Sequence, residues 1–252
     1  MKKPLIRICI GVFALAAVAL VVSMFFLGSI VKKGVETIGP RVAQVEVKLD
    51  SADVWLLAGR AQLKGLSIGN PPGCKTETAI KVRDITLSMN TLSVLSHKAI
   101  IGSVIVKSPE ITLEGGLRNN NLTQIRKNVN AYVSSHADSS PTGTGPDVSP
   151  PAAGKPGRRF QINDLLITGA RVHIASLFST GASVTIPLPD IHMAGLGAGP
   201  AGITAPEVLQ KALTALLNSI AEITPDAIGK LGKGAVSNVK KAGEQLKGLF
   251  DR

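Results

Sequence analysis

The sequence is poor in cysteine, in aromatic residues and in acids, and each shortage excludes something. Its two cysteines are Cys9, inside a long apolar run, and Cys74, beyond that run, so no internal disulfide is expected and burial must stabilise the fold. Aromatic residues make up 3% of the chain, which leaves few rings to stack on nucleic-acid bases despite a formal net charge of +11. Attraction to an anionic lipid surface explains a basic chain better. A basic surface without function is an equally simple interpretation.

No grouping of side chains predicts catalysis or a metal site. The histidines do not share metal-ligand spacing, and no G-x-S-x-G serine motif is present. Asp50 with Asp53, and Glu110 with Glu114, have strand spacing and predict a solvated sheet face instead of an acid–base pair. The segment 197–202 matches G-x-G-x-x-G, but no βαβ unit surrounds it, so we expect a flexible loop. The sequence therefore predicts no catalytic residue, no metal and no cofactor.

A long uncharged stretch, Ile8–Val31, dominates the N-terminus. Its 24 residues would span roughly 36 Å as a helix, enough for the ~30 Å hydrocarbon core of a bilayer. Lysines and an arginine precede it, which favours a cytoplasmic N-terminus. We therefore predict a transmembrane anchor over residues 1–33. A cleaved signal peptide is the alternative, because Ala-x-Ala segments lie at 14–16 and 17–19.

From Val42 the pattern changes to the period of two that is typical of half-buried strands. The alternation shifts at Gly65 and again near Asp84, and a glycine at such a shift indicates a β-bulge. Short strands without long helices between them predict an antiparallel sheet with one solvated and one apolar face. The strands expected before residue 115 lie around 45–57, 63–68, 80–89, 100–106 and 111–113.

The middle of the chain predicts a helix followed by a linker. Apolar residues recur at helical spacing over 121–136. The segment 137–157 is rich in Pro, Gly, Ser and Thr and is expected to be disordered. Because strand signals resume over 160–193, we interpret the linker as a long excursion from one sheet. Pro187 and Pro189 cannot donate hydrogen bonds to a ladder, so this segment is expected to be an edge strand or to leave the sheet there.

The C-terminal part predicts two helices. Thr204–Glu207 forms a capping box, and helical spacing continues to about Ile223. A second, glycine-rich helix follows, with a local charge balance over 230–252 of 6 − 2 = +4. Such a helix lies on an anionic membrane or docks on the sheet or on the preceding helix, and the sequence leaves both open. The stripe that would contact a membrane or a partner is Ile228, Leu231, Val239, Leu246 and Leu249.

Several segments resemble the N-terminal part of bacterial AsmA-like proteins. They are 63–73 (LKGLSIGNPPG), 80–85 (IKVRDI), 105–111 (IVKSPEI), the helix start Asn121–Leu122 and 184–192 (VTIPLPDIH). On these motifs the chain resembles a short, single-pass inner-membrane member of that family, over the anchor and residues 42–223.

The resemblance implies a periplasmic bulk, a curved sheet that forms an open apolar groove, and a role in phospholipid transport or outer-membrane maintenance. About seven strands spaced ~4.8 Å apart give a groove of roughly 34 Å, too short to cross a periplasm alone. The expected partners are a phospholipid or other acyl-chain ligand, the membrane, and a further copy or another envelope protein. Nucleic acid is not expected.

The fold predicted from all of this is α+β. An N-terminal transmembrane helix is followed by a curved antiparallel, groove-like sheet with one helix after its first five strands, and by C-terminal amphipathic helices. The predicted domains are the anchor over 1–33, the β domain over 34–200 with the linker inside it, and a helical region over 201–252.

Two functional hypotheses remain. In the first, an apolar face binds acyl chains. In the second, that face is an ordinary core covered by helices, and the chain is a non-enzymatic envelope scaffold. The alternation does not tell which face is core and which is groove. The candidate lining residues are Val45, Val47, Leu49, Leu66, Ile68, Ile85, Leu87, Ile105 and Ile186.

Overall fold

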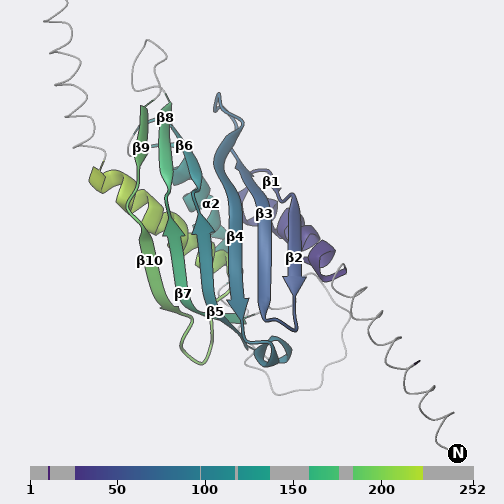
Figure 1. Cartoon of the computed structure of the whole chain (residues 1–252). Coiled ribbons are helices and arrows are strands. Elements are labelled where there is room, and N and C mark those ends of the chain that lie inside the picture. Colours follow the sequence, from purple (N-terminus) through teal and green to yellow (C-terminus); the bar gives the residue numbers. More distant parts are fainter. Residues whose placement is uncertain are drawn as a thin grey trace, which may run out of the picture.

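The computed structural model describes residues 11, 26–96, 98–116, 119–136, 159–175 and 184–223. These residues form an α+β fold in which helices lie on one face of a ten-stranded mixed sheet (Figure 1). The helices are 26–43, α2 (Asn121–His136) and 205–223, together with the 3₁₀ turn η1 (Leu92–Leu95). The other face of the sheet, turned toward the viewer in Figure 1, carries no helix among the described residues, and we call it the open face.

The sheet has the strand order β10-β7-β5-β4-β6-β8-β9, and β3 joins β4 to β1 and β2. The strands are β1 (Val47–Lys48), β2 (Ser51–Trp55), β3 (Arg60–Gly69), β4 (Thr78–Met89), β5 (Lys98–Lys107), β6 (Glu110–Glu114), β7 (Arg159–Thr168), β8 (Arg171–Ala175), β9 (Val184–Pro187) and β10 (Ile191–Leu196).

Most of these strands are halves of longer, interrupted ones. β1 and β2 both pair with β3, and β5 and β6 both pair with β4. β7 pairs with β5 and β8 with β6, both in parallel. β10 pairs with β7 and β9 with β8, both antiparallel. The interruptions therefore line up across the sheet, and we call this the break line. It runs through Asp50, Gly65, Arg83–Asp84, Ser108–Pro109 and Gly169–Ala170.

Gly65 shows why the break line needs particular residues. In β3, Lys64 pairs with Asp84 and Leu66 with Val82, so the register with β4 is the same on both sides of Gly65. Its φ is +64°, and a Cβ there would lie 1.9 Å from Oδ2 of Asp50. Glycine alone adopts this conformation without a steric cost and leaves room for the neighbouring strand. The shift of alternation predicted at Gly65 is confirmed, because Leu63 and Leu66 both pack against the core. The predicted β-bulge is wrong, because the register of β3 with β4 shifts between Ile68 and Gly69 and not at Gly65.

Each interruption also changes which residues face the helices. In β4, Ile80 and Val82 are buried before Arg83–Asp84, and Ile85 is buried after it. A strand normally alternates with a period of two, but here two residues, Arg83 and Asp84, separate the buried Val82 from the buried Ile85. This change of parity keeps aliphatic side chains on one face along the whole strand. The shift predicted near Asp84 is confirmed.

The sheet is mixed, whereas the sequence predicted an antiparallel one. β5 and β7 are parallel, with Lys98 opposite Arg159 and Lys107 opposite Thr168. β6 and β8 are parallel as well. The reason is that β6 ends at the opposite end of the sheet from the start of β7, so the chain must cross back between them. Of the residues between β6 and β7, the structure describes α2 as the main element on this return path.

The core lies between the aliphatic sheet face and the helices. Leu122, Ile125 and Val129 of α2 are buried in it, as are Leu213, Leu216 and Ile220 of the C-terminal helix. The helices predicted over 121–136 and 204–223 are confirmed within a residue. The edge position predicted from Pro187 and Pro189 is confirmed too, because β9 and β10 end the strand order.

Three predictions fall mainly or wholly outside the described residues. Among the residues described, no helix is long and apolar enough to cross a membrane, so the predicted transmembrane helix is unsupported by the structure. Most of Ile8–Val31 lies outside those residues, as do the linker 137–157 and the whole stripe from Ile228 to Leu249.

Candidate functional site

Nearly all of the candidate lining residues lie under the helices. Leu66 and Leu87 are half-buried and pack against the core cluster. Ile105 is the exception, because it pairs with Thr86 and Leu166 on the open face. The remaining candidates are buried, namely Val45, Val47, Leu49, Ile68, Ile85 and Ile186. The first candidate site is therefore the aliphatic interior between the sheet and the helices.

The helix 26–43 is fixed to β1 and β2 by polar contacts. The Lys32 ammonium donates to the Asp50 carbonyl at 3.0 Å, and Glu36 accepts from the Leu49 N–H at 3.2 Å. Gly28 lies against the Ala52 carbonyl, where a Cβ would meet the oxygen at 2.1 Å. The helix therefore runs along β1 and β2 with residue 28 near the Trp55 end.

α2 is fixed by a cluster of asparagines at its start. Asn121, 3% exposed, donates from Nδ2 to the Thr112 carbonyl at 2.7 Å and to Oδ1 of Asn70 at 2.6 Å. Its Oδ1 accepts from the Glu114 N–H at 3.0 Å. The Asn120 side chain accepts from the Thr123 N–H at 2.8 Å, which is an N-cap contact. These bonds tie the helix to β6 and to the turn after β3.

The C-terminal helix 205–223 is held at its start and by its apolar side. Ile203 exchanges two backbone hydrogen bonds of 2.8 Å with Phe160, and Glu207 closes the predicted capping box on Thr204. Gln210 donates to Asn130 of α2 at 2.9 Å. The Arg159–Glu207 pair, at 3.8 Å and partly exposed, stabilises little. Aliphatic contact with the core attaches most of the remaining length of this helix.

A second candidate site is a polar hollow on the open face, along the break line. Its volume is about 690 Å³. The cations at its wall are Lys81, Arg83, Lys107 and Arg171, and the carboxylates are Asp50, Asp84 and Glu110. No described residue forms an ion pair within 4.0 Å with any of these four cations. The hollow can therefore hold a charged or zwitterionic group of a ligand or partner.

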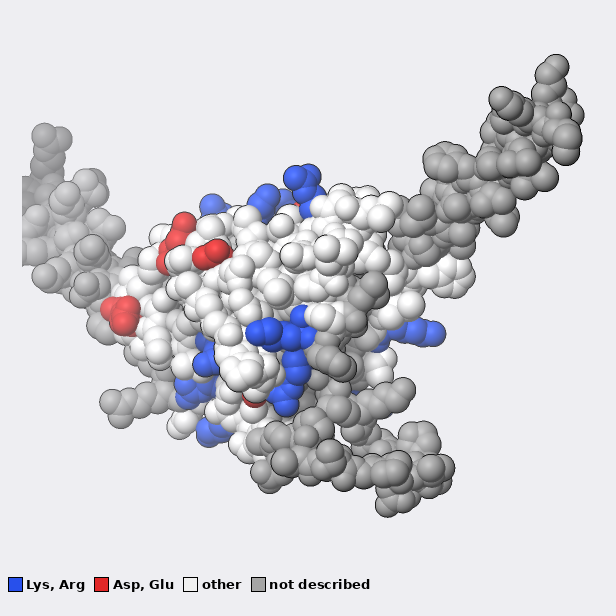
Figure 2. Space-filling model, turned by 90° about the horizontal axis from the view of Figure 1, so that it is seen from below, with Lys and Arg blue, Asp and Glu red and all other residues white. Residues whose placement is uncertain are grey.

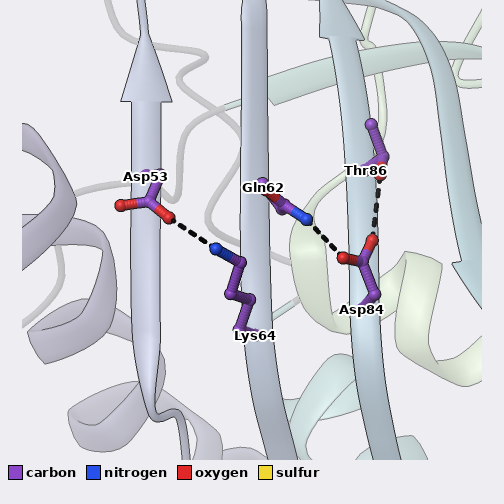
Figure 3. A network of polar contacts seen from close by, with 5 residues as sticks. All are labelled: Asp53, Gln62, Lys64, Asp84 and Thr86. Atoms are coloured by element: carbon purple, nitrogen blue, oxygen red, sulfur yellow. Dashed lines mark hydrogen bonds and ion pairs between the residues drawn. The ribbon is translucent and has the colours of Figure 1, made fainter.

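Polar contacts organise the open face beside this hollow (Figure 3). Asp84 accepts hydrogen bonds from the Gln62 amide and, at 3.0 Å, from the Thr86 hydroxyl. Asp53 and Lys64 form an ion pair of 3.4 Å across β2 and β3. All of these groups are at least partly exposed, so they define a polar surface more than they stabilise the fold.

The charged groups of the open face form no reactive arrangement. His192 contacts Asp164 at 3.0 Å, and His173 contacts Thr185 at 2.8 Å, in separate parts of the sheet. Among the described residues, no group of three metal-binding side chains comes together. His173 is partly exposed and His192 is exposed, so both are solvent-facing strand residues.

Glu114 and Cys74 are the groups near the hydrogen-bonded start of α2 whose pKa values shift. Burial alone would raise the pKa of Glu114, but hydrogen bonds from Lys75 and Thr76 outweigh it, and the pKa lies below its ordinary value. Burial, and then the nearby Glu114 charge, raise the pKa of the Cys74 thiol, which keeps it protonated and poorly nucleophilic.

The sequence prediction missed the polar hollow. Its walls come from β3, β4, β5, β6 and β8 and from Asp50 between β1 and β2, and no sequence pattern brings these segments together. The available signal was the series of interruptions at Gly65, Asp84, Pro109 and Gly169. Their alignment into one line depends on the strand register, which the alternation alone does not give.

Comparisons with known proteins give no relative. No family model matches the chain, and no curated protein matches it either.

Proposed function

We propose that this chain is a membrane-anchored, non-enzymatic envelope protein that binds phospholipid acyl chains, in a periplasm and at an inner membrane. The resemblance to AsmA-like proteins supports the compartment and the ligand class. The observation that carries the proposal is that the helix 205–223 covers the β7–β10 half of the aliphatic sheet face. This helix is held there largely by aliphatic contacts. Acyl chains are chemically equivalent to the side chains that they would replace there.

In this proposal the helix 205–223 moves and the other two helices stay. The helix 26–43 is hydrogen-bonded to the strand region through Lys32 and Glu36, and α2 is hydrogen-bonded to the sheet at its start through Asn121. Asn128 of α2 also donates to the Ala43 carbonyl at the end of the helix 26–43. The C-terminal helix is tied at Ile203 and through Gln210. Swinging it outward about residue 203 would open the β7–β10 half of the interior to an acyl chain.

The test is to compare one protein with this helix free and pinned. Gln210→Cys and Asn130→Cys, in a Cys9→Ser, Cys74→Ser background, replace two side chains whose amide atoms lie 2.9 Å apart. The full-length variant is joined or not joined with a short thiol-reactive linker, supplied with phospholipid in detergent, and examined by native mass spectrometry. We expect lipid on the unlinked protein and much less on the linked one. Equal lipid retention in both forms would contradict the moving helix.

The second candidate function is a non-enzymatic scaffold that contacts a partner protein. The charged hollow on the open face favours it, because unpaired Lys and Arg side chains suit an acidic partner segment. A photo-crosslinking amino acid at Lys107 of the full-length chain should then give one discrete protein adduct in cells. The same amino acid at Lys127, exposed on α2, is the control. Identical adduct patterns at both positions would count against a specific partner at the hollow.

A further inference from the structure

One end of the sheet exposes large apolar side chains on turns. At the lower end in Figure 1, Leu57 is 75% exposed in the β2–β3 turn, and Leu92 is 85% exposed at the start of η1. Trp55, the last residue of β2, is 39% exposed. Turns normally carry Gly, Pro, Asn, Asp or Ser at such positions, so two protruding leucines are not explained by turn geometry.

The two turns form one hydrogen-bonded unit. The Thr91 hydroxyl donates to the Leu56 carbonyl at 2.9 Å, and the Met89 N–H donates to the Gly59 carbonyl at 2.7 Å. The hydroxyl of Ser93 accepts from the Ile100 N–H at 2.8 Å, which fixes η1 to β5. Leu57 and Leu92 therefore belong to one supported tip, and each is the next residue after a partner of the Thr91–Leu56 hydrogen bond.

The chain enters the described fold at this same end. Because Gly28 lies against Ala52 and Gly39 against Val47, the helix 26–43 runs with its first residues toward the Trp55 end of β2. Phe26 is 66% exposed there. The uncharged sequence that begins at Ile8 leads directly into this point.

The charges at this end suit an anionic surface. Arg60, exposed, pairs with Trp55 across the turn, and Lys98 and Arg159 begin the neighbouring strands β5 and β7. No acid occurs in the turn residues 56–59 or in 90–96. Figure 2, which looks onto this end, shows Lys and Arg side chains around it, whereas the Asp and Glu side chains in view lie mostly to one side.

We propose that this end rests on a bilayer that contains anionic phospholipid, with Trp55, Leu57 and Leu92 in the headgroup region. Tryptophan and leucine flanked by arginine and lysine are the residues that membrane interfaces favour. Protruding tips can enter a soft lipid surface without a complementary pocket. The contact fixes the sheet upright on the membrane, with the break line and the C-terminal helix held above it. It does not depend on lipid binding under the helices.

Trp55 is the one tryptophan of the chain, so its fluorescence reports on this contact directly. The full-length protein is reconstituted into phosphatidylcholine–phosphatidylglycerol vesicles, with or without phosphatidylcholine brominated near the headgroup. We expect the shallow bromines to quench Trp55 emission. In Leu57→Asp/Leu92→Asp the quenching should fall by about twofold or more, because carboxylates are expelled from the interface.

The matched control is Pro72→Asp, which adds a carboxylate at an exposed turn at the opposite end of β3 and should leave the quenching unchanged. If the double Asp variant does not fold, Leu57→Ser/Leu92→Ser serves in its place. Absence of quenching in the unsubstituted protein, or equal quenching in the Leu57/Leu92 variant, overturns the proposal. Loss of lipid under the helices, with this quenching retained, would contradict only the lipid-site proposal.

Discussion

At the scale of single residues, Gly65 has the most demanding position on the break line. Gly65→Ala would place a methyl group at a φ of +64°, within 2.8 Å of the Cβ of Asp50 as well as against its carboxylate. We expect a loss of about 2–4 kcal/mol in the free energy of unfolding, since neither the backbone nor the Asp50 Cβ can move away cheaply. Denaturant unfolding followed by Trp55 fluorescence measures this loss.

Gly73→Ala is the matched control for Gly65→Ala. Gly73 also has a positive φ, +94°, but a Cβ there meets nothing within 4 Å. Gly73→Ala should lower the free energy of unfolding by about 1 kcal/mol, because it has the cost of the positive φ but no steric clash. Equal losses for the two variants would show that the contact with Asp50 plays no part.

Glu114 predicts a pH dependence of stability. Its pKa is lowered in the folded state from the ordinary 4.5, so its stabilising contribution is present above that value and is lost as the pH falls through the folded pKa. Glu114→Gln should therefore destabilise the protein most at neutral pH and progressively less below pH 4.5. Urea unfolding at a series of pH values tests this, and Thr76→Val, which removes one of the hydrogen bonds, should give a smaller effect of the same sign.

At the scale of elements, α2 depends on one buried amide. Asn121→Ala would leave the Thr112 backbone carbonyl, the Glu114 N–H and the side-chain Oδ1 of Asn70 without the bond from Asn121. We expect a cost of about 2–4 kcal/mol, because buried polar groups would lose hydrogen bonds. Asn128→Ala removes the bond to the Ala43 carbonyl and an exposed one from Gln124, and should cost about 1 kcal/mol. Thermal unfolding of the two variants compares them, and a smaller loss for Asn121→Ala would contradict this account of α2.

The elements also show what the sequence can and cannot predict. α2 and the helix 205–223 were predicted because helical periodicity and a capping box are local signals. The shift of alternation at Gly65 was predicted because one glycine coincides with it, but the bulge expected there is absent, since the register with the neighbouring strands stays the same. The parallel pairing of β5 with β7 was not predicted. It depends on where the chain returns to the sheet after it leaves β6, and no local pattern shows that. The polar hollow was missed for the same reason, since it exists only once the interruptions are aligned by register.

At the scale of the whole molecule, the two sheet faces should differ in how far a charged substitution destabilises the protein. Ile85 is buried under the helices, whereas Ile105 lies half-exposed on the open face. Ile85→Asp should cost about 4 kcal/mol or more, because it buries a carboxylate without a partner. Ile105→Asp should cost about 1 kcal/mol. Similar losses in denaturant unfolding would contradict the assignment of the faces.

The asymmetry also limits how the lipid proposal can be tested. Charged substitutions in the buried candidate residues would unfold the sheet before they reported on a ligand. A crosslinking probe must therefore replace a half-buried residue on the sheet face that the helices cover. Met193 of β10 meets this condition, because it packs against the core cluster. Ala194, the next residue, is exposed on the open face.

This pair of neighbours gives the most direct measurement. A photo-crosslinking amino acid is placed at Met193 or at Ala194 in the full-length chain, in cells whose phospholipid carries radioactive phosphate, and adducts are counted after irradiation. Lipid binding between the sheet and the helix 205–223 predicts a labelled adduct at Met193 and little or none at Ala194. No labelled adduct at Met193, in a chain that unfolds at the temperature of the unsubstituted protein, would contradict the proposal and leave the scaffold as the function to pursue.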